Sequence, residues 1–217
     1  MSVYFGYAAS LFRRGVGVRA RVTKLSRPLF LRRPTGVALF GPLILGLDAF
    51  ALINVVPLTW THWREAPEDS SDAEAPAVRP PLRPWWQRAC ACAIQFTAGA
   101  FVAGSVLIYR GRMLTLVSLL PPKNPAVAST ASNRRIFIQT AGNWRSNGTI
   151  FPLSACTLTR VEEKAMFLQV KGEYAGWQLN LDDSIIDGKP VDSVEQACKT
   201  LAAHWHAAGG KGTIKAS

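Results

Sequence analysis

Two long apolar runs dominate the hydropathy pattern of the first half of the chain. The first covers residues 36–60, "GVALFGPLILGLDAFALINVVPLTW", and its one charged residue is Asp48. The second lies within residues 85–110, where residues 89–109 carry no charge. About 20 apolar residues suffice to cross the hydrocarbon core of a bilayer. The pattern predicts two transmembrane helices, and a soluble protein with two buried helices is the alternative that length leaves open.

The segment that joins the two runs has the opposite character. Residues 61–84 hold five acidic residues and five prolines, without apolar periodicity. Such a segment cannot bury a core, so we expect a disordered connector. Trp60 and Trp63 lie at its beginning and Trp85 and Trp86 at its end, which would place both pairs at one membrane interface. The two runs then form a hairpin.

Basic residues flank the hairpin on the side away from the connector. Eight Lys and Arg lie in the first 33 residues, and Arg110 and Arg112 follow the second run. Lys and Arg near the ends of a span mark the side that is not translocated, so both termini share one compartment. Residues 1–35 lack acids and are rich in Arg, which is typical of a mitochondrial presequence; a retained basic arm is the alternative. The presequence interpretation places both termini in the matrix of the mitochondrion and the hairpin in its inner membrane.

Cys90 and Cys92 are the first candidates for chemistry. Residues two apart on a helix point about 200 degrees away from each other, so the pair cannot hold one ion together. We interpret both as small residues of a packing helix, whose predicted packing face further along comprises Gly99, Ala100, Ala103 and Gly104. A copper site, which would need additional donors, and a thiol oxidoreductase are the alternatives.

Asp48 is costly in the middle of an apolar helix. An acid there raises the insertion free energy by roughly 2.5 to 3.5 kcal/mol, so a polar partner is expected. Gln95, in the second run, is the nearest candidate within the hairpin. Two hypotheses stay open: Asp48 and Gln95 contact another membrane protein, or Asp48 is hydrogen-bonded inside the hairpin.

The hydropathy period changes after the second run, and residues 111–210 predict a small α+β domain. Its β-rich stretches are short and separated by turn residues, so we expect strands that pair mostly in antiparallel orientation. About five strands are expected, in residues 113–120, 134–141, 149–160, 165–173 and 176–183. Asn147-Gly148 predicts a type I′ hairpin turn between two of them.

A C-terminal helix completes this domain, before a tail of residues 211–217. Asp192 is its predicted N-cap, and Glu195 completes an approximate capping box. Gly209 and Gly210 end the helix. One apolar stripe faces the core; it comprises Val194, Ala197, Cys198, Leu201 and Trp205.

The domain carries few signs of catalysis. His204 and His206 are two apart on the predicted helix and face different directions, so they are not a metal pair. Cys198 belongs to the apolar stripe, and Cys156 has no His nearby in the sequence. No phosphate loop or nucleophile elbow is present. We therefore predict no enzyme activity, no cofactor, no metal and no small-molecule substrate.

A basic patch on the domain is a candidate contact for RNA or the ribosome. Its members are Arg134, Arg135, Arg145 and Lys171. From Arg112 onward the chain has 12 Lys and Arg against eight acids, a mild excess for a nucleic-acid module. A solvated strand face is the simpler interpretation.

The order of two spans and a β-rich domain resembles the transmembrane protein 223 family of the mitochondrial inner membrane. The resemblance covers residues 85–205, and its most telling pieces are Phe151-Pro152-Leu153, Leu168-x-Val170-Lys171-Gly172 and Leu179-x-Leu181-Asp182. It implies a non-enzymatic role in cytochrome c oxidase biogenesis, linking early assembly intermediates to mitochondrial translation. The implied partners are membrane lipids, oxidase subunits or assembly intermediates, and the mitochondrial ribosome. The alternative is a membrane-tethered module whose pleckstrin-like domain binds a lipid or another ligand.

Overall fold

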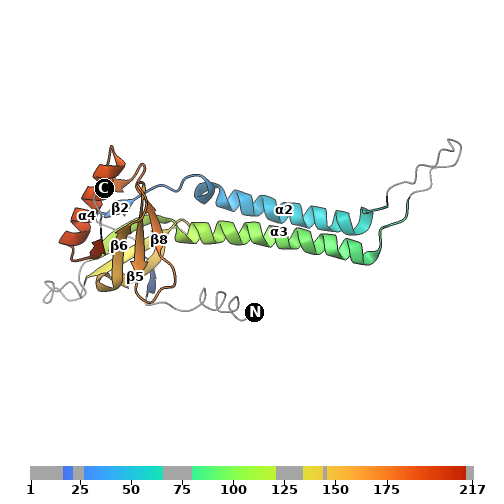
Figure 1. Cartoon of the computed structure of the whole chain (residues 1–217), viewed down its shortest axis with the longest axis horizontal. Helices are drawn as coiled ribbons and strands as arrows, with labels where there is room; N and C mark the ends of the chain where they lie inside the picture. The colour runs from blue at the N-terminus through green and yellow to red at the C-terminus, as the bar shows by residue number, and fades with distance from the viewer. Residues whose placement is uncertain (1–16, 22–26, 66–79, 121–133, 144–145, 214–217) are drawn as a thin grey trace. The chain divides into compact units, whose positions relative to one another are not determined.

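The computed structural model describes residues 17–21, 27–65, 80–120, 134–143 and 146–213. They fall into two compact units. One holds the described residues up to Leu39 and from Tyr109 onward, and contains the sheets; the other holds those of Phe40–Ile108, and contains two paired helices (Figure 1).

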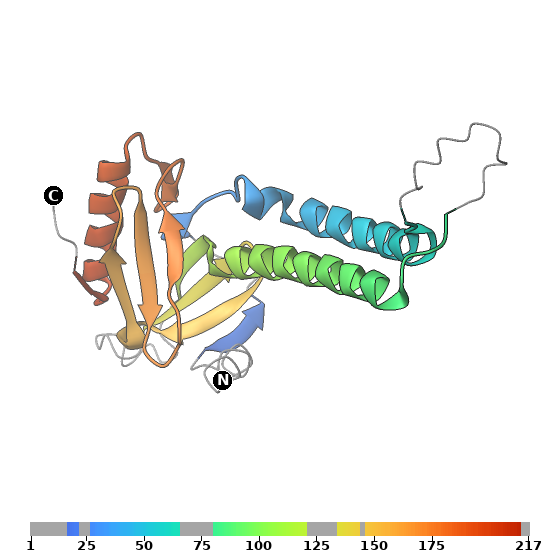
Figure 2. The same ribbon diagram turned by 45° about the vertical axis from the view of Figure 1, so that its right-hand side comes forward.

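Two long apolar helices stand where the hydropathy pattern predicts them. Helix α2 spans Val37–His62 and helix α3 spans Trp85–Arg112. Both are long and apolar enough to cross a membrane. They run side by side in both views (Figures 1 and 2). Pro42 and Pro57 lie inside α2 without ending it, as expected for a helix of this type.

The remaining secondary structure is the predicted mixture of mostly antiparallel strands and one C-terminal helix. The larger sheet is antiparallel throughout, in the order β1 (Val18–Arg21), β5 (Asn147–Pro152), β4 (Arg135–Thr140), β3 (Leu114–Leu120), β2 (Phe30–Leu31), β9 (Ile185–Ile186) and β10 (Lys189–Pro190). The smaller sheet has the order β11 (Lys211–Thr213), β6 (Cys156–Arg160), β7 (Ala165–Val170) and β8 (Trp177–Asn180), with β11 parallel to β6.

Each of the five predicted stretches contains a strand, but the stretch 149–160 contains two. The 3-10 turn η3 (Leu153–Ala155) divides it, so β5 pairs in one sheet and β6 in the other. Pro152 ends β5, and its lack of an N–H favours the end of a strand over its middle. Buried residues from both sheets and from the C-terminal helix share one apolar core; among them are Phe30, Phe151, Leu158, Met166 and Trp205.

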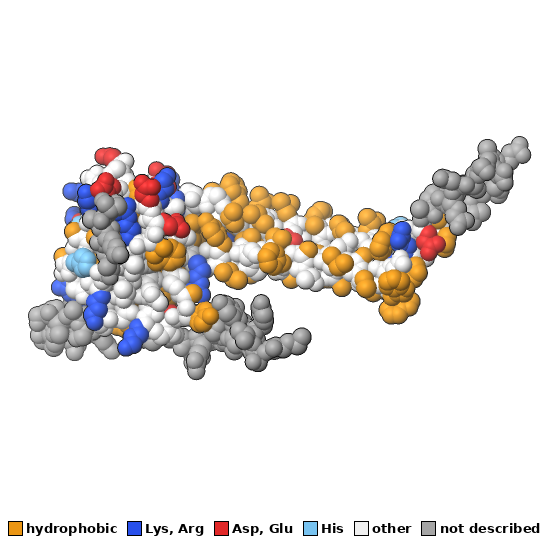
Figure 3. All heavy atoms as spheres, in the orientation of Figure 1, with side chains coloured by type: hydrophobic (Ala, Val, Ile, Leu, Met, Phe, Trp, Pro, Cys, Tyr) orange, Lys and Arg blue, Asp and Glu red, His pale blue; other side chains and the backbone are white. Residues whose placement is uncertain are grey.

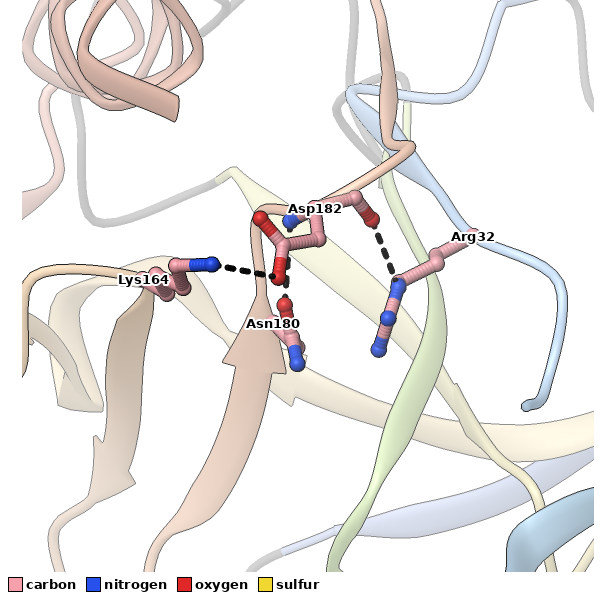
Figure 4. Close-up of polar contacts among 4 residues, drawn as sticks. All are labelled: Arg32, Lys164, Asn180 and Asp182. Atoms are coloured by element: carbon pink, nitrogen blue, oxygen red, sulfur yellow. Dashed lines mark hydrogen bonds and ion pairs between the residues drawn. The ribbon is translucent and has the colours of Figure 1, made fainter. Parts of the chain in front are cut away.

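The segment before α2 belongs to this domain, which the boundary at residue 111 does not anticipate. Phe30 in β2 is fully buried, and the strand pairs with β3 on one side and β9 on the other. Arg32 is buried and donates from Nε to the Asp182 carbonyl oxygen at 2.8 Å (Figure 4). Strand β1 pairs with β5 in the same sheet. Residues 18–21 and 30–32 therefore contribute strands and a side-chain contact to the domain.

The loop that receives Arg32 is itself held by side chains. The backbone N–H of Asp182 donates to Asn180 Oδ1 at 3.0 Å, and the Asp182 carboxylate lies 3.7 Å from Lys164 Nζ (Figure 4). Arg32 meets the backbone carbonyl of Asp182 and not its carboxylate. The contact therefore fixes the loop after β8 to the chain that enters α2.

The predicted turn at Asn147-Gly148 is wrong. Both residues lie in β5, and Gly148 does not have a positive φ. A Cβ added to Gly148 would lie 2.4 Å from the carbonyl oxygen of Ile138 and 2.4 Å from the Phe137 ring. The glycine is needed for close approach to β4 and not for a left-handed turn.

The C-terminal helix α4 spans Val194–Ala207 and begins one residue later than predicted. Ser193, not Asp192, is the N-cap, and its Oγ accepts from the backbone N–H of Gln196 at 3.2 Å. Glu195 forms an ion pair with Lys199 at 2.7 Å instead of closing a capping box. The predicted stripe faces the core, and Gly209 follows the helix with a φ of 85°. Figure 2 shows α4 beside the four-stranded sheet.

Candidate functional site: the apolar hairpin

The outer surface of the paired helices is apolar over most of its length. Ile53 of α2 and Phe101 of α3 are 72% and 76% exposed, and orange side chains cover both helices in Figure 3. Charged side chains gather instead over the sheets and α4, and at the connector end of the hairpin (Figure 3). A continuous apolar surface of this size marks a membrane or partner contact.

Close approach of the two helices depends on Gly99. It is buried in α3, and an added Cβ would lie 2.6 Å from Leu52 Cδ1 of α2 and 3.2 Å from Asp48 Oδ1. One turn later, Ala103 is half-buried. Small residues at such contacts let helix backbones come close together in lipid.

The predicted packing face is therefore divided between two sides of α3. Ala100 is exposed, and a Cβ at Gly104 would meet nothing within 4 Å among the described residues. Gly99 faces α2, whereas Ala100 and Gly104 leave room beside the helix. Gly99 of the predicted face thus packs against α2 within the hairpin, whereas Ala100 and Gly104 form a small-residue surface that α2 does not cover.

Gln95 does not pair with Asp48. Its Nε2 donates to Thr59 Oγ1 of α2 at 2.9 Å. Its Oε1 is buried and, within the described part of the chain, accepts no hydrogen bond. Thr59 lies near the connector end of α2, about three turns beyond Asp48 in the sequence. The internal pairing considered for Asp48 and Gln95 is thus replaced by Gln95 and Thr59.

Asp48 is half-buried beside Gly99. Among residues that the structure describes, it has neither a hydrogen-bond donor nor an ion-pair partner. No hydrogen bond within the described part of the hairpin therefore supports the hypothesis of an internal partner for Asp48. The carboxyl group keeps its capacity to meet a donor from outside the chain.

A shallow groove lies along the hairpin at Gln95. It has a volume of about 490 Å³, and its lining comprises Leu58, Thr59, His62, Trp63, Ala91 and Gln95. The groove is largely apolar, and the polar side chains of Thr59, His62 and Gln95 form part of its wall. An apolar side chain with one polar group would fit this combination.

Arginine side chains lie over the tryptophans at the connector end of the hairpin. The guanidinium of Arg83 lies 4.9 Å from the centre of the Trp63 ring, and that of Arg88 lies 5.0 Å from the Trp60 ring. Arg88 Nη1 also donates to the Trp60 carbonyl oxygen at 2.7 Å. Cation–π contacts of this kind contribute about 0.5–1 kcal/mol each where they are exposed.

The ends of the connector are paired with each other. Arg64 and Leu82 form an antiparallel bridge, and the Glu65 N–H donates to the Pro81 carbonyl oxygen at 3.0 Å. Arg64 Nη1 donates to the Pro80 carbonyl oxygen at 2.8 Å. Both ends of the predicted 61–84 connector are therefore ordered and bonded to each other. The rest of the connector, residues 66–79, where we expect disorder, lies outside the described residues.

The hairpin cysteines have different surroundings. Cys90 is exposed, whereas Cys92 is half-buried and its Sγ lies 3.7 Å from the Val56 carbonyl oxygen as a weak donor. Both are free thiols. Among the described residues, no group of three or more His, Cys, Asp or Glu side chains is placed to hold a metal ion.

The candidate basic patch is partly described. The backbones of Arg134 and Lys171 both bond to η3, since Leu153 N–H donates to the Arg134 carbonyl and Lys171 N–H donates to the Ala155 carbonyl. Arg135 is half-buried in β4, and Lys171 is exposed. Arg145 lies outside the described residues. Arg134 and Lys171 thus approach one end of the domain from two different strands.

The cysteines and histidines of the domain do not meet in a site. Burial raises the pKa of the Cys156 thiol to about 12, so it is a neutral thiol at physiological pH. Cys198 is buried in the stripe of α4, as predicted. His204 and His206 are exposed on either side of Trp205.

Three contacts at the hairpin were not anticipated from the sequence. They are the Thr59 hydroxyl opposite Gln95, and Arg83 and Arg88 over the tryptophan rings. Arg83 and Arg88 lie close to Trp85 and Trp86 in the sequence, and two further tryptophans lie at the other end of the connector. This clustering of arginine and tryptophan favours cation–π contacts. The Thr59 contact depends on the register between two helices, which no local pattern specifies.

Comparison of the chain with models of protein families, with characterised proteins and with solved structures gave no significant match. Its function therefore has to be inferred from the hairpin and the domain.

Proposed function

We propose that the chain is a non-enzymatic factor of the mitochondrial inner membrane that assists cytochrome c oxidase biogenesis. The hairpin inserts into the membrane with both termini in the matrix, and it packs beside newly made oxidase subunits. The domain contacts early assembly intermediates or the translation machinery from the matrix. The named complex comes from the resemblance to the transmembrane protein 223 family.

The groove at Gln95 is the observation that best supports a partner inside the membrane. Its lining is largely apolar, and it also holds the polar side chains of Thr59, His62 and Gln95. Polar side chains on membrane helices are costly where they face lipid, because no water is present to satisfy them. Another helix seated in this groove would cover them, which favours association over an isolated hairpin.

Asp48 supports the same proposal from another level of the hairpin. Polar and ionisable side chains within membrane helices tend to face partners or functional pathways, because exposure to lipid is unfavourable. Asp48 and Gln95 thus place polar side chains at two levels of a hairpin whose surface is mostly apolar.

A complementation experiment tests the proposal. Cells that lack the protein should lose cytochrome c oxidase selectively, with other respiratory complexes retained. Re-expression of the wild-type chain should restore the oxidase, whereas Gln95→Leu and Asp48→Leu should restore it poorly although the protein accumulates. Asp48→Asn should be milder, because an amide keeps the capacity for hydrogen bonding.

Thr97→Val is a matched control for the loss of a polar group. Thr97 is exposed on α3, and its hydroxyl donates to the Ala93 carbonyl of its own helix. This variant should restore the oxidase fully. Equal restoration by all four variants would remove the partner-contact argument, and an unchanged oxidase level in deleted cells would overturn the proposed function.

A further inference from the structure

We propose that a basic depression on the domain binds the phosphate group of an anionic headgroup. The depression has a volume of about 550 Å³, and its described lining comes from β1, from β5 and from Gly142 and Asn143 after β4. Two arginines of the N-terminal arm, Arg19 and Arg21, form part of its wall. This ligand class deepens the alternative of a lipid-binding domain, and its location at a membrane surface rests on the membrane insertion proposed above.

Strand pairing places the two arginines together. Residues two apart in a strand point to the same face, so Arg19 and Arg21 project together from β1. Their direct neighbours on β5 are Thr149 and Asn147 respectively. The Cβ atoms of such pairs lie about 4.5–5.5 Å apart, which brings two guanidinium groups and two polar side chains onto one small surface.

The arginines keep donors for a ligand. Arg21 uses Nε to donate to Ser146 Oγ at 3.2 Å, which orients its guanidinium and leaves its two Nη groups. Arg19 has no hydrogen bond or ion pair with the described residues. A guanidinium binds phosphate oxygens through two parallel hydrogen bonds, so a pair of them can hold one terminal phosphate group.

The polar wall is completed by the turn. Asn143 Nδ2 donates to the Asn147 carbonyl oxygen at 3.0 Å, and its Oδ1 accepts from Thr140 Oγ1 at 3.0 Å. These contacts hold the turn in place without occupying either arginine. Gly148 in the wall has no room for a side chain, as its close approach to Ile138 shows. The depression therefore exists before any ligand binds.

The described lining favours an anion over a cation. Arg19 and Arg21 supply positive charge to the depression, and none of its described lining residues is acidic. An anionic group is therefore the ligand class that this surface attracts.

The location of the depression favours a lipid headgroup as the source of that phosphate. Gly142, in its wall, donates its N–H to the Arg110 carbonyl oxygen at 2.9 Å, and Arg110 Nη2 donates to the Ala141 carbonyl at 2.8 Å. Arg110 directly follows the uncharged run of α3. Arginines at the end of a membrane helix lie at the level of the headgroups, and basic pockets at that level bind anionic lipids.

Titration of the purified full chain in a neutral detergent tests the proposal. Dihexanoyl phosphatidic acid, a soluble lipid with a terminal phosphate, is the probe, and its heat of binding is measured by calorimetry. Dihexanoyl phosphatidylcholine and inorganic phosphate are titrated in parallel. We expect phosphatidic acid to bind most tightly, because the depression provides contacts beyond a single phosphate and the choline group is cationic.

Paired substitutions locate the site. Arg19→Gln with Arg21→Gln should weaken phosphatidic acid binding about tenfold or more, as expected for the loss of charge-assisted hydrogen bonds. Arg160→Gln with Lys189→Gln removes the same charge from β6 and β10 and should leave the affinity unchanged. Arg19→Lys with Arg21→Lys keeps the charge but not the paired donors, and should give an intermediate affinity.

Three results would overturn the proposal. One is equal weakening by both glutamine pairs, which would indicate attraction to net charge only. The second is absent phosphate binding. The third is tighter binding of an RNA oligonucleotide, titrated in the same way, through the same arginines. Binding of inorganic phosphate as tight as that of phosphatidic acid, and lost with Arg19 and Arg21, would support the phosphate site and assign it to a soluble phosphate compound. Since detergent replaces the membrane, failure of the oxidase experiments would leave this result intact.

Discussion

Gln95 Nε2 of α3 donates to Thr59 Oγ1 of α2 at 2.9 Å, and this contact joins the two apolar helices near the connector. Hydrogen bonds between membrane helices contribute about 0.6 kcal/mol on average and up to about 1.7 kcal/mol. A double-mutant cycle with Thr59→Val and Gln95→Leu should give a coupling free energy in that range. The free energy of unfolding in mixed micelles, followed by tryptophan fluorescence, measures it; strict additivity would show that the contact is not formed.

Gly99 should be far more sensitive to a large side chain than Gly104. Gly99→Leu puts a side chain into the space of Leu52, whereas the position of a Cβ at Gly104 is open. Overpacking of a filled interface costs about 1–3 kcal/mol. Thermal unfolding of both variants in detergent compares them, and equal melting temperatures would contradict the described helix pairing.

Phe30→Ala should strongly destabilise the domain, although Phe30 precedes both apolar helices in the chain. Removing a buried phenylalanine side chain costs about 3–5 kcal/mol. Val18→Ala, at a side chain that is 66% exposed, is the control and should change the stability by less than about 0.5 kcal/mol. Denaturant unfolding measures both, and a small effect at Phe30 would show that β2 does not belong to the core.

The same burial limits where an import sequence can be removed. Cleavage after Arg32 would take away β2 and the Arg32–Asp182 contact. If the chain is processed on import, we expect the new N-terminus upstream of Gly17, so that β1 is kept. N-terminal sequencing of the protein from mitochondria checks this expectation, and a first residue after Gly17 would contradict it.

Cys156 should resist alkylation in the folded protein. Burial raises its pKa from the ordinary 9.0 to about 12, so the thiolate that reacts is scarce in the folded state at neutral pH. Because the folded pKa is raised, this thiol favours unfolding increasingly above pH 9, where the unfolded thiol ionises first, and favours neither state below that. Mass spectrometry after maleimide treatment at pH 8 should find Cys156 modified only upon denaturation. Rapid modification of the native protein would contradict the burial.

The two apolar helices and the core strands could be predicted because each has its own local pattern. An apolar run of sufficient length requires no partner to be recognised, and the short run of Ile and Phe bounded by polar residues in 134–141 identifies β4 in the same way. The stripe of α4 was also correct, since its spacing follows the helical period. Its N-cap was misplaced by one residue, because Asp192 and Ser193 are both good caps and only the backbone geometry distinguishes them.

Features that depend on contacts distant in the sequence could not be predicted. Strands β2 and β9 are two residues long, too short for any period, and they exist because β2 pairs with β3 on one side and with β9 on the other. The depression at Arg19 and Arg21 requires β1 to meet β5, more than a hundred residues away. Gly148 was misinterpreted for a related reason: glycine serves both positive φ and close packing, and only its neighbours show which.

Affinity purification of the tagged full chain from detergent-solubilised mitochondria tests the central proposal most directly. Quantitative mass spectrometry should find cytochrome c oxidase subunits and early assembly intermediates enriched over subunits of other respiratory complexes. This enrichment should be lower for Gln95→Leu and unchanged for Thr97→Val. Alkaline carbonate extraction first shows that the protein is integral to these membranes. The proposal would then be contradicted if oxidase subunits were recovered no better than subunits of the other complexes.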